Sequence, residues 1–122
     1  MIWICESDDF CEPDFVEHLV PAFADNSVTI AFGRIQFCDS DGEFMEGLDN
    51  YRGGAEPGIW SNNTKRPAAE WFRNGFGVNN VIANVGGCIF RKVILPDEIW
   101  ATARTFRICA DWYLYINLSL IH

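Results

Sequence analysis

Trp3-Ile4-Cys5-Glu6-Ser7-Asp8-Asp9-Phe10-Cys11-Glu12-Pro13-Asp14-Phe15 is the stretch that decides the predicted fold. Residues 2–5 form a short continuous apolar run, which is typical of a strand that is buried on both faces and covered by helices. A carboxylate cluster and then a helix start follow this run. Many α/β enzymes hold a divalent cation against a phosphate where a strand ends and a helix begins. The stretch therefore predicts an α/β fold with a site at the end of the first strand.

The acidic residues of this stretch are the first candidates for a site. A turn at residues 7–9 would aim two of the three carboxylates of Glu6, Asp8 and Asp9 at one ion. Oxygen ligands of this kind favour Mg²⁺ or Mn²⁺, with water or substrate phosphate in the remaining positions. The alternative is that Asp8 and Asp9 only cap the following helix, and the residues alone leave both interpretations open.

Length, composition and charge limit the classes of function. A chain of 122 residues with 49% apolar and 15% aromatic residues predicts a single domain with ample material for a core. The formal charge of -8 disfavours nucleic acids and anionic membrane surfaces as non-specific partners. In so acidic a protein, a site that uses phosphate is expected to recruit a cation.

Cysteine usage and hydropathy predict a cellular location. The five cysteines are odd in number and show no C-x-x-C spacing, which predicts reduced, buried thiols in a cytoplasmic protein. No apolar run approaches about 18 residues, and no signal peptide is expected. The sequence therefore predicts no membrane span.

Periodicity predicts the elements of the first third of the chain. Apolar residues at helical spacing follow Pro13, and Pro21 should kink or end this helix. Its apolar face comprises Phe15, Val16, Leu19, Val20 and Phe23. From Val28 an alternating pattern predicts a strand, with a bulge or bend at Gly33 where the pattern changes phase.

The rest of the chain alternates between turn signals and apolar segments. Asp39-Ser40-Asp41-Gly42 predicts a plain turn, and residues from about 43 to 65 predict a long irregular loop. The further elements expected are a short helix within 66–76, a strand within 84–92, and helices at 96–106 and 110–121. The strand within 84–92 begins with small residues, which indicates that something approaches its backbone closely.

Four segments, taken in order, resemble the second half of family 2 glycosyltransferases: E-S-D-D-F-C-E-P-D-F-V-E, I-A-F-G-R-I-Q-F-C-D-S-D-G, N-V-G-G-C-I-F-R-K and A-D-W-Y-L-Y. The resemblance covers nearly the whole chain. It implies a GT-A fold and transfer of a sugar from a nucleotide-diphosphate donor, usually with inversion and a divalent cation. It also implies a partial GT-A-like domain over residues 1–122 that lacks the N-terminal nucleotide-binding half, and hence either a missing half or self-association.

The resemblance assigns roles to particular residues. It places Asp8 and Asp9 in a DXD-like motif, whose carboxylates meet Mn²⁺ or Mg²⁺ and the ribose and diphosphate of the donor. Glu6 falls where many members carry an Asp that contacts the donor. Asp111 falls where the family places its general base. A sugar hydroxyl is a poor nucleophile, and a positioned carboxylate accelerates its attack by about 10²- to 10⁴-fold.

Plainer interpretations stand beside these roles. Taken alone, Asp111 favours the N-cap of the last helix, and it is the order of the motifs that raises the catalytic role above capping. Trp112, Trp71 and Trp60 fit either stacking on a sugar ring, with Trp112 best placed, or burial in a core.

Three functions of the chain remain open at this stage. The first is an inverting glycosyltransferase or a piece of one. The second is a non-catalytic module derived from that fold, which would form homo-oligomers. The third is an unrelated metal-dependent enzyme that processes phosphate with the same acidic loop.

Overall fold

The structure, a computed structural model, describes residues 1–45 and 62–120 of the chain. The chain divides into two compact units. The first unit comprises residues 1–33 together with 82–122, and the second comprises residues 34–81. The prediction of a single domain stays a prediction, and each unit is described separately.

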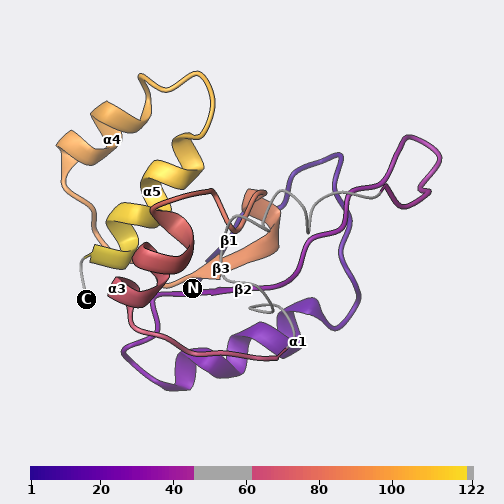
Figure 1. Ribbon diagram of the computed structural model, residues 1–122, viewed down its shortest axis with the longest axis horizontal. Coiled ribbons are helices and arrows are strands. Elements are labelled where there is room, and N and C mark those ends of the chain that lie inside the picture. Colours follow the sequence, from indigo (N-terminus) through magenta and orange to yellow (C-terminus); the bar gives the residue numbers. More distant parts are fainter. Residues whose placement is uncertain (46–61, 121–122) are drawn as a thin grey trace. The chain divides into compact units, whose positions relative to one another are not determined.

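A three-stranded antiparallel sheet organises the first unit (Figure 1). Its strands are β1 (Ile2–Trp3), β2 (Ile30–Phe32) and β3 (Cys88–Phe90), in the order β1-β3-β2. Because β3 runs antiparallel to both neighbours, β1 and β2 run in the same direction. Strands of equal direction need a long crossover, and a helix lies in the connection between β1 and β2. The unit is therefore a small mixed α/β fold.

The two faces of this sheet are covered by different helices. The register aligns two rows across the strands, one of Ile2, Phe90 and Ile30 and the other of Trp3, Ile89 and Ala31. Successive side chains of a strand point to opposite faces. The Trp3 ring packs on Phe15 of the first helix with 5.5 Å between ring centroids. Cys88, from the opposite face, lies beside Tyr115 of the last helix.

Burial differs sharply between the central strand and the first strand. Cys88 and Ile89 of β3 are 0% and 2% exposed, whereas Ile2 and Ile4 are 37% and 44% exposed. The prediction that residues 2–5 form a strand buried on both faces is therefore wrong. The strand ends at Trp3, and the central position of the sheet belongs to β3.

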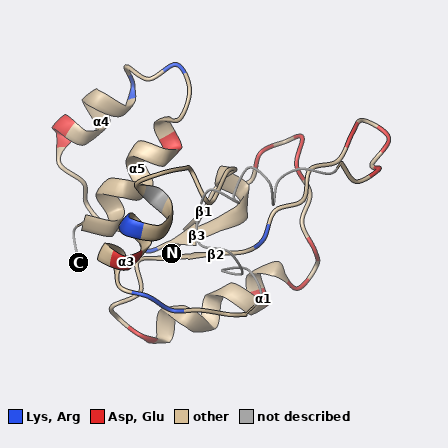
Figure 2. Cartoon of the chain, in the orientation of Figure 1, with Lys and Arg blue, Asp and Glu red and all other residues tan. Residues whose placement is uncertain are grey.

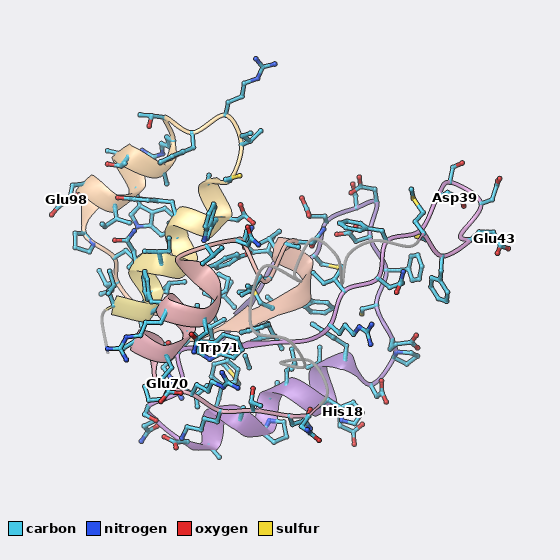
Figure 3. The ribbon with its side chains drawn as sticks, viewed as in Figure 1. His18, Asp39, Glu43, Glu70, Trp71 and Glu98 are labelled. Atoms are coloured by element: carbon cyan, nitrogen blue, oxygen red, sulfur yellow. The ribbon has the colours of Figure 1, made fainter. Side chains whose placement is uncertain are left out.

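The first helix follows its sequence pattern. The α-helix α1 (Phe15–Leu19) continues into a 3₁₀ turn, Val20–Ala24, which contains Pro21. Pro21 ends the α-helix because its ring removes the amide that the next helical hydrogen bond requires. His18 lies on the exposed side, 3.0 Å from the Asp14 carboxylate (Figure 3). The predicted helix and its end at Pro21 are confirmed.

Arg91, directly after β3, holds the connection between α1 and β2. Its guanidinium donates hydrogen bonds to the carbonyls of Phe23, Asp25 and Val28 at 3.0 to 3.1 Å. It also lies 5.5 Å from the centre of the Phe23 ring. Bonds from a charged donor to several carbonyls fix a turn more firmly than neutral bonds do. Arg91 therefore joins segments that lie more than 60 residues apart.

Two helices complete the first unit. The helix α4 (Asp97–Ala103) begins after Pro96, and α5 (Ala110–Leu120) contains the buried Tyr115, Leu118 and Ser119. Phe106, in the connection, stacks on Tyr113 with 5.3 Å between ring centroids. Both predicted helices are confirmed, although α4 ends three residues earlier than the pattern suggested.

The second unit contains a hairpin and a helix. Residues 39–42 form the predicted turn, closed by an antiparallel bridge between Cys38 and Phe44. The short helix predicted within 66–76 is α3 (Ala68–Trp71), which continues into a π-helical turn, Phe72–Phe76. Most of the long loop predicted at 43–65 lies outside the described residues.

The cysteines and the helices bear on the predicted location. All five thiols are free. Cys88 is buried and Cys38 is half-buried, whereas Cys5, Cys11 and Cys109 are exposed. The expectation of buried thiols is thus wrong for those three. Within residues 1–45 and 62–120, the structure contains no helix that is both long and apolar enough to span a membrane.

Candidate functional site

The candidate site begins at the carboxylate loop, defined as residues 6–9, which follows β1. A turn forms at Ser7 and Asp8, where the Asp9 amide donates to the Glu6 carbonyl at 3.4 Å. The side chains of Glu6, Asp8 and Asp9 are all exposed. The predicted turn is present, and its carboxylates are open to a ligand.

Asn84, from a distant segment of the same unit, holds the Asp9 carboxylate. Its Nδ2 donates to Asp9 Oδ2 at 2.8 Å, across 75 residues of sequence. Its Oδ1 accepts a hydrogen bond from the Gly86 amide at 2.5 Å. Because an amide side chain has one acceptor end and one donor end, the bond to Gly86 directs the NH₂ group toward Asp9.

Gly86 lies between the carboxylate loop and β1. The indole of Trp3 donates to the Gly86 carbonyl at 2.8 Å. A Cβ at Gly86 would lie 3.0 Å from Asn84 Oδ1 and 3.3 Å from Asp9 Oδ2. The sequence predicted a close approach to the small residues before β3, and the approaching groups are Trp3 and Asp9.

Asp111 lies in the first turn of α5. The Cys109 carbonyl accepts from the Tyr113 amide at 3.2 Å. This is the first helical hydrogen bond, so Cys109, just before α5, takes the N-cap position. Asp111 is therefore inside the first turn and not at the N-cap position that the plainer interpretation gave it. A carboxylate here is favoured by the positive end of the helix dipole.

Tyr115 is a buried residue on the same helix as Asp111. It lies one turn after Asp111 on α5 and is 1% exposed. Burial raises the pKa of Tyr115, and the nearby Cys88, Asp111 and Glu6 raise it further.

Cys88 lies beside Tyr115, on the central strand β3. Burial raises the pKa of the Cys88 thiol to about 11, while the contact with Tyr115 lowers it and the Asp111 charge raises it. A thiol with so high a pKa is protonated at neutral pH and is a poor nucleophile. Cys88 therefore belongs to the packing beneath the site.

The predicted residues fall into separate groups. The structure ties Asp9 to Asn84 by a hydrogen bond, whereas Glu6 and Asp8 lie exposed on the same loop and Asp111 lies on α5. Trp112 is half-buried on α5, next to Asp111.

The other two tryptophans do not extend this site. Trp71 lies in the second unit with the Arg66 guanidinium 5.7 Å from its ring centre, and Trp60 lies outside the described residues.

The carboxylates that the structure describes do not by themselves form a metal-binding cluster. Within residues 1–45 and 62–120, no three side chains of His, Cys, Asp or Glu gather closely enough to hold a metal ion. Mg²⁺ is commonly held by one or two carboxylates together with substrate phosphates. Asp8 and Asp9 offer two exposed carboxylates on the carboxylate loop.

Sequence reasoning missed Asn84 and Tyr115. Asn84 stands at the start of the N-V-G-G segment, where an Asn before small residues is typical of a side chain that caps a turn. Tyr115 follows Asp111 at the i+4 spacing that places two side chains on one face of a helix. These two signals were present, but neither names the distant partner.

Comparisons of the chain with family models, with curated proteins and with solved structures find no match. Its function is therefore to be inferred from the geometry of the site and from the motifs of the sequence.

Proposed function

We propose that this chain is a glycosyltransferase-like protein that carries the cation-binding and general-base side of an inverting, family 2-like site. One observation carries the proposal. The carboxylate loop after β1, which Asn84 holds through Asp9, and the first turn of α5 belong to one compact unit, although they lie about 100 residues apart in sequence. The predicted cation residues and the predicted base thus belong to the same unit. The partial GT-A fold is part of this proposal.

Asp8 and Asp9 would bind Mn²⁺ or Mg²⁺ together with the diphosphate of a nucleotide-sugar. Their oxygens are of the kind that these cations prefer, and both side chains are exposed. When bound, the cation stabilises the negative charge that grows on the departing diphosphate. Glu6, on the same loop, would contact the donor.

Asp111 would act as the general base. Its carboxylate takes the proton of an acceptor hydroxyl while the hydroxyl oxygen forms a bond to the anomeric carbon. The bond between that carbon and the diphosphate oxygen breaks on the opposite side, and the nucleoside diphosphate leaves with its electron pair. Such an attack inverts the anomeric configuration. Trp112, half-buried beside Asp111, would line the acceptor side.

A thermal-shift titration tests the donor half of this proposal. The purified chain is heated with Mn²⁺, with UDP and with both, alongside the variant Asp8→Ala, Asp9→Ala. We expect a rise in melting temperature that needs both ligands, because a cation shared with a diphosphate binds weakly without it. The rise should vanish in the variant. An equal rise in the variant would refute the assignment of Asp8 and Asp9.

One observation favours the second candidate, a non-catalytic interaction module. β1 lies at an edge of the described sheet, and Met1, Ile2 and Ile4 are exposed there. Exposed edges with apolar side chains favour pairing with another chain. Light scattering at several protein concentrations measures the oligomeric state of the wild type and of Ile2→Lys. A dimer that dissociates in Ile2→Lys, in a protein whose melting temperature does not change with ligand, would favour the module over the enzyme.

A further inference from the structure

We propose that Asn84 is a positioning residue that holds the Asp9 carboxylate in the orientation required for the cation and the diphosphate. This inference rests on the proposed function and assigns to that site a residue that the sequence motifs do not include. Its basis is the 2.8 Å hydrogen bond from Asn84 Nδ2 to Asp9 Oδ2.

The Asn84 side chain is itself held in one orientation. Its Oδ1 accepts from the Gly86 amide, so a flipped amide would set two donors against each other at Gly86 and two acceptors against each other at Asp9. Only the observed orientation satisfies both neighbours. An Asp side chain has no such donor, and a Ser side chain is too short to reach Asp9.

The backbone around Asn84 is fixed as well. The Asn84 amide donates to the Ile82 carbonyl at 2.8 Å, and the Gly87 amide donates to the Asn84 carbonyl at 3.1 Å. Ala83, just before it, has a φ of +65°, which a residue with a side chain adopts only when its surroundings enforce it. Asn84 is thus a half-buried anchor in a tight turn, whereas Asp9 is on an exposed loop.

A chain of hydrogen bonds links this anchor to the sheet. The Trp3 indole donates to the Gly86 carbonyl, the Gly86 amide donates to Asn84, and Asn84 donates to Asp9. The loop carboxylate is therefore set relative to β1 by groups on both sides of the turn. Partners that orient a ligating carboxylate typically raise metal affinity by about 10- to 100-fold.

Asn84→Ser separates positioning from folding. The Ser hydroxyl can still accept from the Gly86 amide, so the turn should persist, but the bond to Asp9 is lost. Asn26→Ser, the same change at an exposed position of the same unit, is the matched control. Mn²⁺ binding is measured with the metal and UDP by isothermal titration calorimetry, and folding is followed by thermal denaturation.

We expect Asn84→Ser to bind Mn²⁺ about tenfold more weakly, with a melting temperature close to that of the wild type, while Asn26→Ser binds as the wild type does. Equal Mn²⁺ affinity in Asn84→Ser and the wild type would overturn this inference and leave the proposed function standing. A wild-type chain that does not bind Mn²⁺ would contradict the proposed function, and this inference with it.

A second measurement decides the matter if Asn84→Ser fails to fold. The side-chain NH₂ signals of Asn84 are observed by NMR in the wild type and in Asp9→Ala. Loss of the Asp9 acceptor should shift these signals and speed their exchange with water, whereas the signals of Asn26 should stay in place. Unchanged Asn84 signals would show that the amide does not hold Asp9 and would overturn the inference.

Discussion

Two turns of this chain contain several Asp and Glu residues (Figure 2), and their carboxylates accept hydrogen bonds from different kinds of donor. In the acidic hairpin, defined as residues 39–43, Asp39 Oδ1 accepts from the backbone amides of Asp41 and Glu43 at 2.9 and 3.0 Å. Figure 3 shows Asp39 and Glu43 at this hairpin. In the carboxylate loop, Asp9 accepts instead from the side chain of Asn84, which lies in a distant segment.

This difference distinguishes an acidic residue that stabilises its own turn from one that a distant residue positions. Asp39 satisfies its own backbone, which is the ordinary role of an Asp at the start of a turn. The bond between Asp9 and Asn84 closes no local turn and orients a side chain that is exposed to solvent. The sequence contains both acidic clusters, yet among residues 1–45 and 62–120 the structure shows a side chain from a distant segment bonded to the carboxylate loop and none bonded to the acidic hairpin.

The glycines of the two regions repeat this contrast. Gly42 has a φ of +83°, and a Cβ there would meet nothing within 4 Å. Its role is to allow the backbone of the hairpin to turn. Gly86 is instead surrounded by Asn84 and Asp9, which leave little room for a side chain.

The largest expected effect comes from removing each acidic pair in turn. Asp8→Ala, Asp9→Ala should abolish the binding of Mn²⁺ with UDP, because the proposed ligands are gone. Asp39→Ala, Asp41→Ala should leave that binding intact and cost the hairpin about 1–3 kcal/mol of stability, because two hydrogen bonds of about 0.5–1.5 kcal/mol each are lost. Calorimetric titration of both variants checks this. Loss of binding in the hairpin variant would reverse the comparison.

The next largest effect concerns transfer alone. Asp111→Asn should lower the rate of sugar transfer by about 10²- to 10⁴-fold, because the amide cannot take the acceptor proton. Binding of Mn²⁺ and UDP should stay near the wild-type value. The measurement is a transfer assay with a panel of nucleotide-sugars and acceptors, run beside the titration. A variant that retains the transfer rate of the wild type would exclude Asp111 as the base.

A matched pair of glycine variants has a smaller effect. Gly86→Ala should weaken Mn²⁺ binding by about tenfold, since its Cβ would displace Asn84 Oδ1 and Asp9 Oδ2. Gly42→Ala should cost about 1–2 kcal/mol of stability, because of its positive φ, and leave binding unchanged. Titration and urea unfolding are compared for the two variants. Similar results for both would mean that Gly86 has only a backbone role.

The smallest effect appears only at alkaline pH and concerns the buried thiol of Cys88. Burial raises the pKa of Cys88 from its ordinary 9.0 to about 11, so the unfolded chain loses this proton first as the pH rises. The stability is complete below pH 9 and falls between pH 9 and 11, by about 1 kcal/mol at pH 10.

Urea unfolding at pH 8 and pH 10 measures this loss. It should be smaller in Cys88→Ala than in the wild type, whereas Cys5→Ala, at an exposed position, should behave as the wild type. An equal loss in all three proteins would assign the alkaline effect to other groups, among them Tyr115, whose pKa burial also raises.

Local features of the fold were predictable from the sequence. Pro21 ends α1 because of its own ring, and Asp39 and Gly42 form a turn through their own backbone preferences. The helix after Pro96 follows from neighbouring residues in the same way. Such features depend on contacts within a few positions, which a single sequence contains.

Features that depend on distant partners were not predictable. A short apolar segment can form either a central strand or an edge strand, and its sequence does not distinguish the two. Residues 2–5 were therefore expected to be buried, whereas β3 is the central strand and β1 lies at the edge. Arg91 and Asn84 act on groups more than 60 residues away. The candidate carboxylates could be found as a pattern, whereas the residue that orients Asp9 becomes visible only in the folded chain.

The most direct test of the central claim is to find where Mn²⁺ binds. Paramagnetic Mn²⁺ broadens the NMR signals of nearby amides, so the isotope-labelled chain is titrated with small amounts of Mn²⁺ in the presence of UDP. We predict that residues 6–10 and 84–87 broaden at lower Mn²⁺ concentrations than residues 39–43. Broadening that begins in the acidic hairpin, or that is equal in both turns, would contradict the central claim.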